Sequence, residues 1–133
     1  AYLKPVRESL DCPYAYDSIG HIGYITRKSI YEDKTLYYND FADLLDDILK
    51  TLIVKGKSLE VNSNGGKLLD FLPTKEILKR YKELGGELVT FGSDAHIAAR
   101  LGEKYYLVAD FLKSIGINYA FKYLAHKPIA VKL

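Results

Sequence analysis

Hydrophobic residues recur along this chain with two different periods, and the helical period is clearest over residues 41–52. The apolar residues of that segment follow the i, i+3, i+4, i+7 spacing of an amphipathic helix: Phe41, Leu44, Leu45, Ile48, Leu49 and Leu52. Asn39 or Asp40 is expected to cap this helix at its start, and Gly56 is expected to end it. The pattern predicts a helix with one face in a core.

Three further helices are predicted. One follows Thr74, a suitable capping residue, and ends at Gly85-Gly86. Another covers about 103–115 and stops at Gly116. Residues 1–12 are expected to contain the end of a helix as well.

Short apolar or alternating segments between the helices predict strands. They cover residues 18–25, 58–61 and 87–91, and the tail adds residues 119–123 and 129–131. Residues 26–38 are expected to form a long loop. Strands that alternate with helices indicate an α/β fold with parallel strands and crossover helices. In such folds the chemically active residues gather at the carboxyl ends of the strands.

Composition narrows the class of protein. The 133 residues form a single predicted unit, 1–133, and 48% hydrophobic with 27% charged residues is typical of a soluble globular chain. No apolar run approaches the ~18 residues of a membrane span, so no membrane association is expected. A net charge of +2 gives no support for nucleic-acid binding. Cys12 is the only cysteine, which favours a reducing, cytoplasmic location, and we expect its thiol to be buried.

Asp94 and His96 form an Asp-x-His pair directly after the predicted strand 87–91. On an extended segment, side chains two residues apart point the same way, so both reach one cation. Carboxylate and imidazole ligands suit Zn, Mn or Fe. The alternative is that Ser93 and Asp94 only cap the following helix and that His96 lies on the surface.

Other candidates lie on the same predicted edge. His21, near the end of the first strand, is either a metal ligand or a hydrogen-bonded core histidine. Arg27 and Lys67 follow two different strands and either bind a phosphate or are ordinary surface charges. Glu60 and Asn62 share one side of the second strand, and they lie near the site if that side is a barrel interior.

Four segments carry the most specific pattern. They are Asp17-Ser18-Ile19-Gly20-His21-Ile22-Gly23, Leu59-Glu60-Val61-Asn62, residues 84–96 ending in Gly92-Ser93-Asp94-Ala95-His96, and Lys127-Pro128-Ile129. In sequence and order they resemble the histidinol phosphatases of the PHP type, the polymerase and histidinol phosphatase superfamily. The resemblance extends from about residue 10 to residue 133.

The resemblance implies a distorted (β/α)7 TIM-like barrel that hydrolyses L-histidinol phosphate, a small phosphomonoester, in histidine biosynthesis. It also implies up to three divalent metal ions (Zn, Mn or Fe). By position His21, Asp94 and His96 resemble metal ligands, and Asp94 and His96 the catalytic pair. Arg27 resembles a phosphate-binding cation, and Asn62 and Lys67 are assigned to the same group.

One motif of the family has no counterpart here. A His-x-His pair on the first strand is absent, and a whole barrel needs ~250 residues. We therefore expect this chain to be the C-terminal half of a PHP phosphatase domain. Such a half-barrel has open sheet edges and is expected to pair with itself or with an N-terminal half. Two alternatives stay open: an inactive partial module that associates or binds, and a PHP-type exonuclease or phosphoesterase with another substrate.

Overall fold

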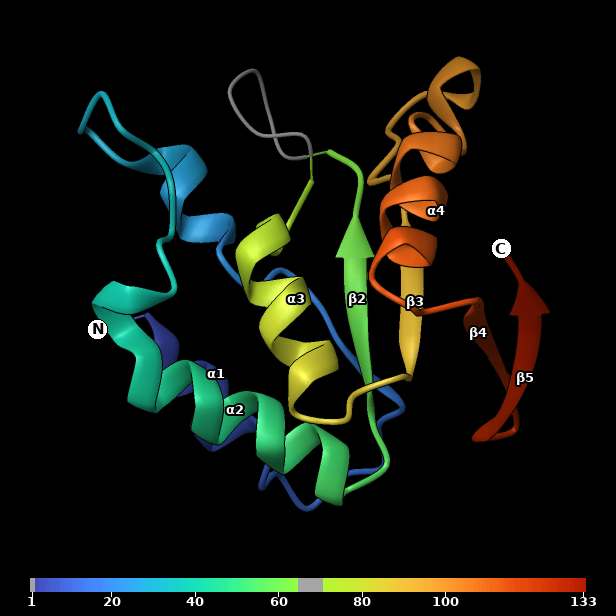
Figure 1. The fold of residues 1–133 in the computed structure, drawn as a ribbon, viewed down its shortest axis with the longest axis horizontal. Coiled ribbons are helices and arrows are strands. Elements are labelled where there is room, and N and C mark those ends of the chain that lie inside the picture. The colour runs from blue at the N-terminus through green and yellow to red at the C-terminus, as the bar shows by residue number, and fades with distance from the viewer. Residues whose placement is uncertain (1, 65–70) are drawn as a thin grey trace.

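The computed structural model describes residues 2–64 and 71–133, and these residues form an α/β unit (Figure 1). The predicted class, with parallel strands joined by helices, is confirmed. In chain order the helices and strands are α1 (Leu3–Ser9), β1 (Ser18–Ile19), η1 (Tyr24–Lys28), η2 (Asn39–Phe41), α2 (Ala42–Val54), β2 (Ser58–Asn62), α3 (Lys75–Glu83), β3 (Val89–Gly92), η3 (Ala98–Arg100), α4 (Tyr105–Ser114), β4 (Tyr119–Leu124) and β5 (Lys127–Lys132), where η denotes a 3-10 helix.

Three strands form a parallel sheet in the order β1-β2-β3. Ile19 lies opposite Leu59, and Leu59 lies opposite Val89. The helices α3 and α4 lie in front of the strands in Figure 1. The main core consists of apolar side chains from the sheet and from α2, α3 and α4: Leu45, Ile48, Leu49, Leu52, Leu59, Val61, Ile77, Leu78, Val89, Val108 and Leu112. Burying each such side chain stabilises the fold by about 1.5–3 kcal/mol, so this core fixes the sheet beneath the helices.

The other face of the sheet carries polar groups. Glu60 and Asn62 alternate along β2 with the fully buried Leu59 and Val61, as strand geometry requires. The hydroxyls of Ser18 in β1 and Thr90 in β3 are 3.0 Å apart, although β2 lies between these strands. Since neighbouring strands are about 4.8 Å apart, side chains of the two outer strands meet only if the sheet is concave on this side.

The tail departs from the predicted run of parallel strands. β4 and β5 pair antiparallel in a separate two-stranded sheet, with Leu124 opposite Lys127. Ala125 and His126 form the turn, at φ 47° and 62°. A two-residue connection with positive φ at both positions joins antiparallel strands only, which explains the difference. The hairpin is fastened to the sheet by Ser58 Oγ and Tyr123 Oη, 2.6 Å apart.

The first strand is shorter than predicted. Only Ser18–Ile19 pairs with β2, and the expected extension through residue 25 is a turn followed by η1. Positive φ values at His21 (61°) and Gly23 (91°) turn the chain, and Tyr24 N donates to His21 O at 2.9 Å. The alternating apolar residues that predicted a longer strand belong instead to this turn, which packs on the core through the buried Ile22.

Three smaller predictions also needed correction or completion. Asn39 and Asp40 lie within η2 and not at the start of α2, whose first residue is Ala42. Thr74 precedes α3 as predicted, but its buried hydroxyl has no hydrogen-bond partner among residues 2–64 and 71–133. The Cys12 thiol is exposed rather than buried.

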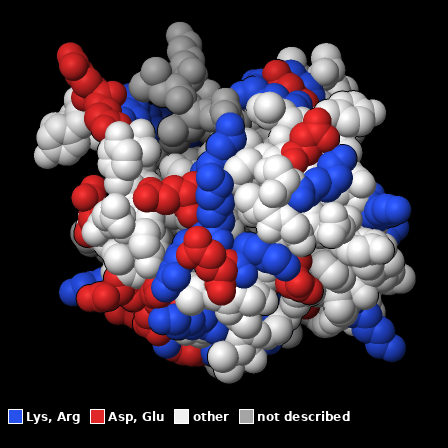
Figure 2. All heavy atoms as spheres, viewed as in Figure 1, with Lys and Arg blue, Asp and Glu red and all other residues white. Residues whose placement is uncertain are grey.

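The surface shows mixed charge. Acidic and basic side chains alternate over much of the face in Figure 2, in keeping with 19 basic and 17 acidic residues. Within the described part of the chain, no helix is long and apolar enough to cross a membrane.

Candidate functional site at the carboxyl edge of the sheet

Three segments meet beyond the carboxyl ends of the parallel strands. They are residues 20–28 after β1, residues 63–64 after β2 and residues 93–104 after β3. In Figure 1 this edge is at the top, where the blue η1 and the orange segment that precedes α4 lie. Ser63 Oγ donates to Glu103 O at 2.6 Å and so ties two of these segments together. Parallel topology therefore gathers residues from distant parts of the sequence.

Asp94 is the centre of this edge. Its Oδ2 lies 3.4 Å from Arg27 Nη1 and 3.3 Å from Asn64 Nδ2. Its Oδ1 lies 3.7 Å from His96 Nε2. The Asp94 side chain is 22% exposed and the His96 side chain 85% exposed, so the histidine extends from the carboxylate into solvent.

Asp94 and His96 lie close together as predicted, but through a different backbone conformation. Asp94 has φ 50° and is not extended, so the two side chains do not meet through strand alternation. Capping by Ser93 and Asp94 is not supported either, since η3 begins after Ile97, but His96 does lie on the surface, as that alternative expected. A left-handed aspartate costs about 1 kcal/mol or more, and such strain is typical of functional positions.

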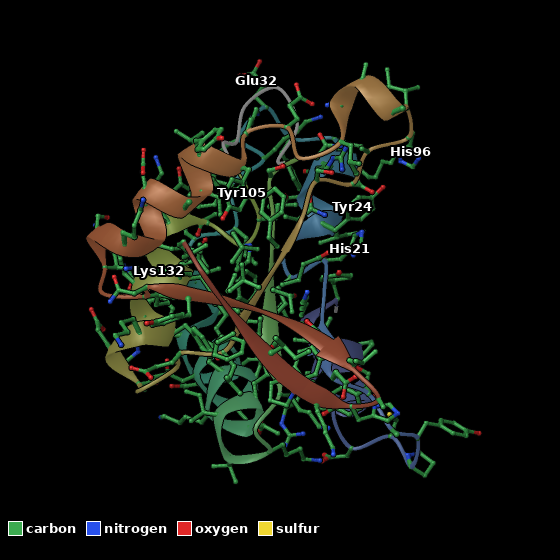
Figure 3. All side chains as sticks on the ribbon, turned by 90° about the vertical axis from the view of Figure 1, so that its right-hand side faces the viewer. His21, Tyr24, Glu32, His96, Tyr105 and Lys132 are labelled. Carbon is green, nitrogen blue, oxygen red and sulfur yellow. The ribbon has the colours of Figure 1, made fainter. Side chains whose placement is uncertain are left out.

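His21 has a tightly defined environment on the same edge. Its backbone N–H donates to Glu60 Oε2 at 3.1 Å, and its carbonyl accepts the Tyr2 hydroxyl at 2.8 Å. Burial raises the pKa of Tyr2, so this hydroxyl stays protonated and able to donate. The His21 ring is 5.1 Å from the Tyr24 ring, edge to face, and the Arg27 guanidinium lies 5.0 Å from the centroid of that same Tyr24 ring. Figure 3 shows His21, Tyr24 and His96 on the same side of the molecule.

Besides Arg27, the sequence predicted Asn62 and Lys67 as phosphate ligands, and of these two the structure describes only Asn62. The Asn62 side chain is buried, and its Oδ1 accepts the backbone N–H of Asn64 at 2.9 Å. This bond turns the chain so that the Asn64 amide reaches Asp94. Lys67 lies outside the described residues, in the segment 65–70.

Two residues of this edge were not identified as site candidates from the sequence alone. Asn64 gave no signal of its own, because asparagine is common in turns, where its side chain bonds to the nearby backbone. Tyr24 gave no separate signal. Its contact with both His21 and Arg27 depends on the tight turn that replaces the predicted strand.

The donors present suit a divalent cation but do not complete a site for one. Imidazole nitrogen and carboxylate oxygen are common Zn ligands. Among the residues that the structure describes, no group of three or more His, Cys, Asp or Glu side chains is arranged to hold a metal ion. His21 faces Glu60, whereas His96 faces Asp94. A metal centre at this edge therefore needs additional ligands.

An apolar hollow of about 520 Å³ lies on the other side of η1. Ile25, Leu36 and Phe41 line it, whereas His21, Asp94 and His96 do not. Tyr2, whose hydroxyl donates to the His21 carbonyl, also lines this hollow, so the two regions adjoin at Tyr2.

The chain is similar in sequence to known histidinol phosphatases. No protein-family model matches the chain. The chain is 38% identical over 104 residues to a probable histidinol-phosphatase of Clostridium acetobutylicum, covering 76% of the chain and 40% of the relative. It is 33% identical over 133 residues to the histidinol-phosphatase of Lactococcus lactis subsp. lactis, covering 88% of the chain and 48% of the relative. The chain is related to the histidinol phosphatases.

A solved structure supports the same histidinol-phosphatase relationship. The histidinol phosphate phosphatase of Lactococcus lactis subsp. lactis Il1403, complexed with Zn, L-histidinol and phosphate, matches with a TM-score of 0.83 and 29% identity. The match covers 96% of the chain and 49% of that protein. The predicted similarity to histidinol phosphatases is confirmed, and the chain spans about half the length of the relatives that it matches.

Proposed function

We propose that this chain is the C-terminal part of a metal-dependent histidinol phosphatase and carries part of its active site. The complete enzyme hydrolyses L-histidinol phosphate to L-histidinol and phosphate, a step of histidine biosynthesis. The observation that carries the proposal is the convergence of Arg27 and His96 on Asp94, at the edge where α/β enzymes place their chemistry. The Lactococcus relative is complexed with Zn, L-histidinol and phosphate, which supports this substrate and a metal requirement.

In this proposal Asp94, His96 and His21 hold divalent metal, with Zn favoured over Mn or Fe because the relative contains Zn. Bound Zn supplies positive charge for the phosphate and acidifies a water molecule. Asp94 and His96 also serve as the catalytic pair that holds or transfers a proton. Because the His96 side chain is 85% exposed, its ring is accessible to a ligand that binds at this site.

Arg27 is proposed to bind the phosphate oxygens. Its planar guanidinium offers several N–H donors that match the geometry of a phosphate. Stacking on Tyr24 and the contact with Asp94 hold it at the rim, where its side chain is 26% exposed. Asn62, through the turn that it stabilises, and Lys67 are proposed to complete the phosphate site.

The fold proposed for the complete enzyme is a distorted (β/α)7 barrel. The concave polar face of the sheet, with Ser18 and Thr90 in contact over β2, supports this idea because a barrel interior has this curvature. We also propose that the chain pairs with an N-terminal half carrying the remaining ligands, or with a second copy of itself. The location proposed is the cytoplasm, where a lone exposed Cys12 stays reduced.

The experiment compares the 133-residue chain with a fusion that places, ahead of Ala1, the part of the Lactococcus lactis phosphatase that the chain does not match. Bound Zn is measured by elemental analysis, and phosphate release is measured from L-histidinol phosphate, p-nitrophenyl phosphate and a short oligonucleotide. We expect the fusion to bind Zn and to prefer L-histidinol phosphate.

The D94N variant of the fusion is expected to release no phosphate. A folded, Zn-loaded fusion that leaves L-histidinol phosphate intact would contradict the proposal, and preference for the oligonucleotide would favour the exonuclease alternative. If the chain alone is active and Zn-loaded, the missing ligands come from a second copy.

A further inference from the structure

Glu60 and Tyr2 hold the backbone of His21 from two sides. The His21 N–H donates to the Glu60 carboxylate at 3.1 Å, while the His21 carbonyl accepts the Tyr2 hydroxyl at 2.8 Å. Between these two contacts His21 adopts φ 61°, a left-handed conformation that costs a residue with a Cβ about 1 kcal/mol or more. The contacts therefore keep His21 in a conformation that it does not prefer.

The position of Glu60 is itself determined by two glycines. A Cβ placed on Gly20, beyond β1, would lie 2.6 Å from Glu60 Oε2, and a Cβ on Gly92, in β3, would lie 2.5 Å from Glu60 Oε1. Real Cβ atoms essentially never come this close to another heavy atom. Glu60 thus extends from the central strand into a socket that is open only because both flanking residues are glycine.

The same carboxylate faces the His21 ring. Glu60 Oε2 is 3.7 Å from His21 Nδ1, which is beyond hydrogen-bond distance but within electrostatic range. The Glu60 side chain is only 21% exposed, so its charge is partly shielded from water. A negative charge on this side favours the tautomer with its proton on Nδ1, which leaves the lone pair on Nε2.

We propose that Glu60 is a positioning residue for His21. Through the amide it stabilises the left-handed turn, and through its charge it keeps the proton on Nδ1, so that Nε2 is presented to a divalent cation. In metalloproteins generally, the carboxylates that orient metal-binding histidines are conserved nearly as well as the metal ligands themselves. The inference rests on the proposed function only in treating His21 as a metal ligand.

The first test measures the tautomer of His21 by long-range ¹⁵N–¹H NMR of the 133-residue chain. The variant E60Q keeps the size of the side chain and an oxygen for the His21 N–H but removes the charge. We expect the His21 tautomer ratio to shift at least about threefold toward Nε2–H. The matched control E87Q, an exposed residue paired with Lys82, leaves the ratio unchanged.

The second test uses the socket and leaves Glu60 in the chain. In G92A the new methyl group displaces the flexible end of Glu60, which costs little stability but moves the carboxylate away from His21. We expect His21 resonances to shift in the direction seen for E60Q. In an E60A background the same G92A substitution is expected to leave His21 unchanged, because the group that it displaces is gone.

The third test separates this inference from the proposed function. Zn²⁺ is titrated into the fusion that supplies the remaining ligands and into its E60Q variant while the His21 ring is observed, and we expect the E60Q fusion to bind Zn²⁺ at least about tenfold more weakly. A wild-type His21 that does not respond to Zn²⁺ contradicts its role as a metal ligand, although Glu60 still controls its tautomer. An unchanged tautomer in folded E60Q or G92A, or equal Zn²⁺ affinity at a responding His21, overturns the positioning role.

Discussion

Arg27 Nη1 lies 3.4 Å from Asp94 Oδ2, although 67 residues separate them in the sequence. The contact joins η1, which follows β1, to the segment after β3, across the end of the central strand. Both residues are candidates for the phosphatase site, one as a phosphate ligand and the other as a metal ligand. Their proximity means that a phosphate bound by Arg27 would lie beside the proposed metal ligand Asp94.

Replacing Arg27 should weaken phosphate binding. In the Zn-loaded fusion we expect R27Q to raise the inhibition constant of inorganic phosphate at least about tenfold, since charge-assisted hydrogen bonds contribute about 1.5–3 kcal/mol. R27K keeps the positive charge but not the planar guanidinium, so its inhibition constant should lie between those of wild type and R27Q. K113Q is the control, because Lys113 is exposed and pairs with Asp110 in α4, outside the segments that form the candidate site. Equal inhibition constants for R27Q and wild type would remove Arg27 from the phosphate site.

The histidines should differ in their importance for metal binding. His96 lies 3.7 Å from Asp94 at the carboxyl edge, whereas His126 lies 3.0 Å from Asp17 at the turn of the β4–β5 hairpin. We expect H96A to lower the Zn²⁺ bound per chain of the fusion, and H126A to leave it unchanged. Elemental analysis after gel filtration measures this. Equal Zn²⁺ content in both variants would show that His96 is not a ligand.

The sequence predicted the parts of the fold that depend on regular spacing. The helices around residues 41–52, 74–84 and 103–115 exist because apolar side chains at helical spacing need a common core. The order of strands and helices also placed Asp94 and His96 at the correct edge of the sheet. These features follow from local pattern and topology, which a single sequence contains.

The remaining features depend on contacts between distant segments. The turn at His21 requires Glu60 and Tyr2, which lie 39 and 19 residues away in the sequence, and no local pattern specifies those bonds. Asp46 of α2 is only 13% exposed and binds Arg80 of α3, although nothing in the spacing of the helix residues 41–52 points to this pair. Such pairs form when two helices pack, so spacing within one helix does not reveal them.

The Asp46–Arg80 pair should make stability depend on acid. Arg80 Nη2 and Nε lie 2.7 Å and 2.9 Å from the two Asp46 carboxylate oxygens, which is a bidentate geometry. Chiefly through this contact, with help from the Tyr38 hydroxyl and Lys50, the pKa of Asp46 is held well below its ordinary value. The pair therefore stabilises the fold above the pKa of an unfolded aspartate, about 3.9, and this contribution is lost as the pH falls below that value.

We expect D46N to lower the free energy of unfolding by about 1–3 kcal/mol at pH 7. The difference from wild type should shrink steadily as the pH falls below about 4, because the Asp46 carboxylate of the unfolded wild type is then protonated, which favours the unfolded chain. Urea unfolding followed by circular dichroism at several pH values measures both effects. D110N, at an exposed residue of α4 paired with Lys113, is the control and should change stability by less than about 0.5 kcal/mol. A D46N penalty that is constant down to pH 3 would contradict the assignment.

The hairpin turn offers a stabilising substitution. Ala125 has φ 47°, a left-handed conformation in which its Cβ is unfavourable, whereas glycine adopts this conformation freely. We expect A125G to raise the free energy of unfolding by about 0.5–1 kcal/mol, even though glycine gives the unfolded chain more freedom. The control is A130G, in the strand β5 opposite Phe121, where glycine should weaken the ladder and lower stability. If both variants lower stability in urea unfolding, the positive φ of Ala125 does not destabilise the folded chain.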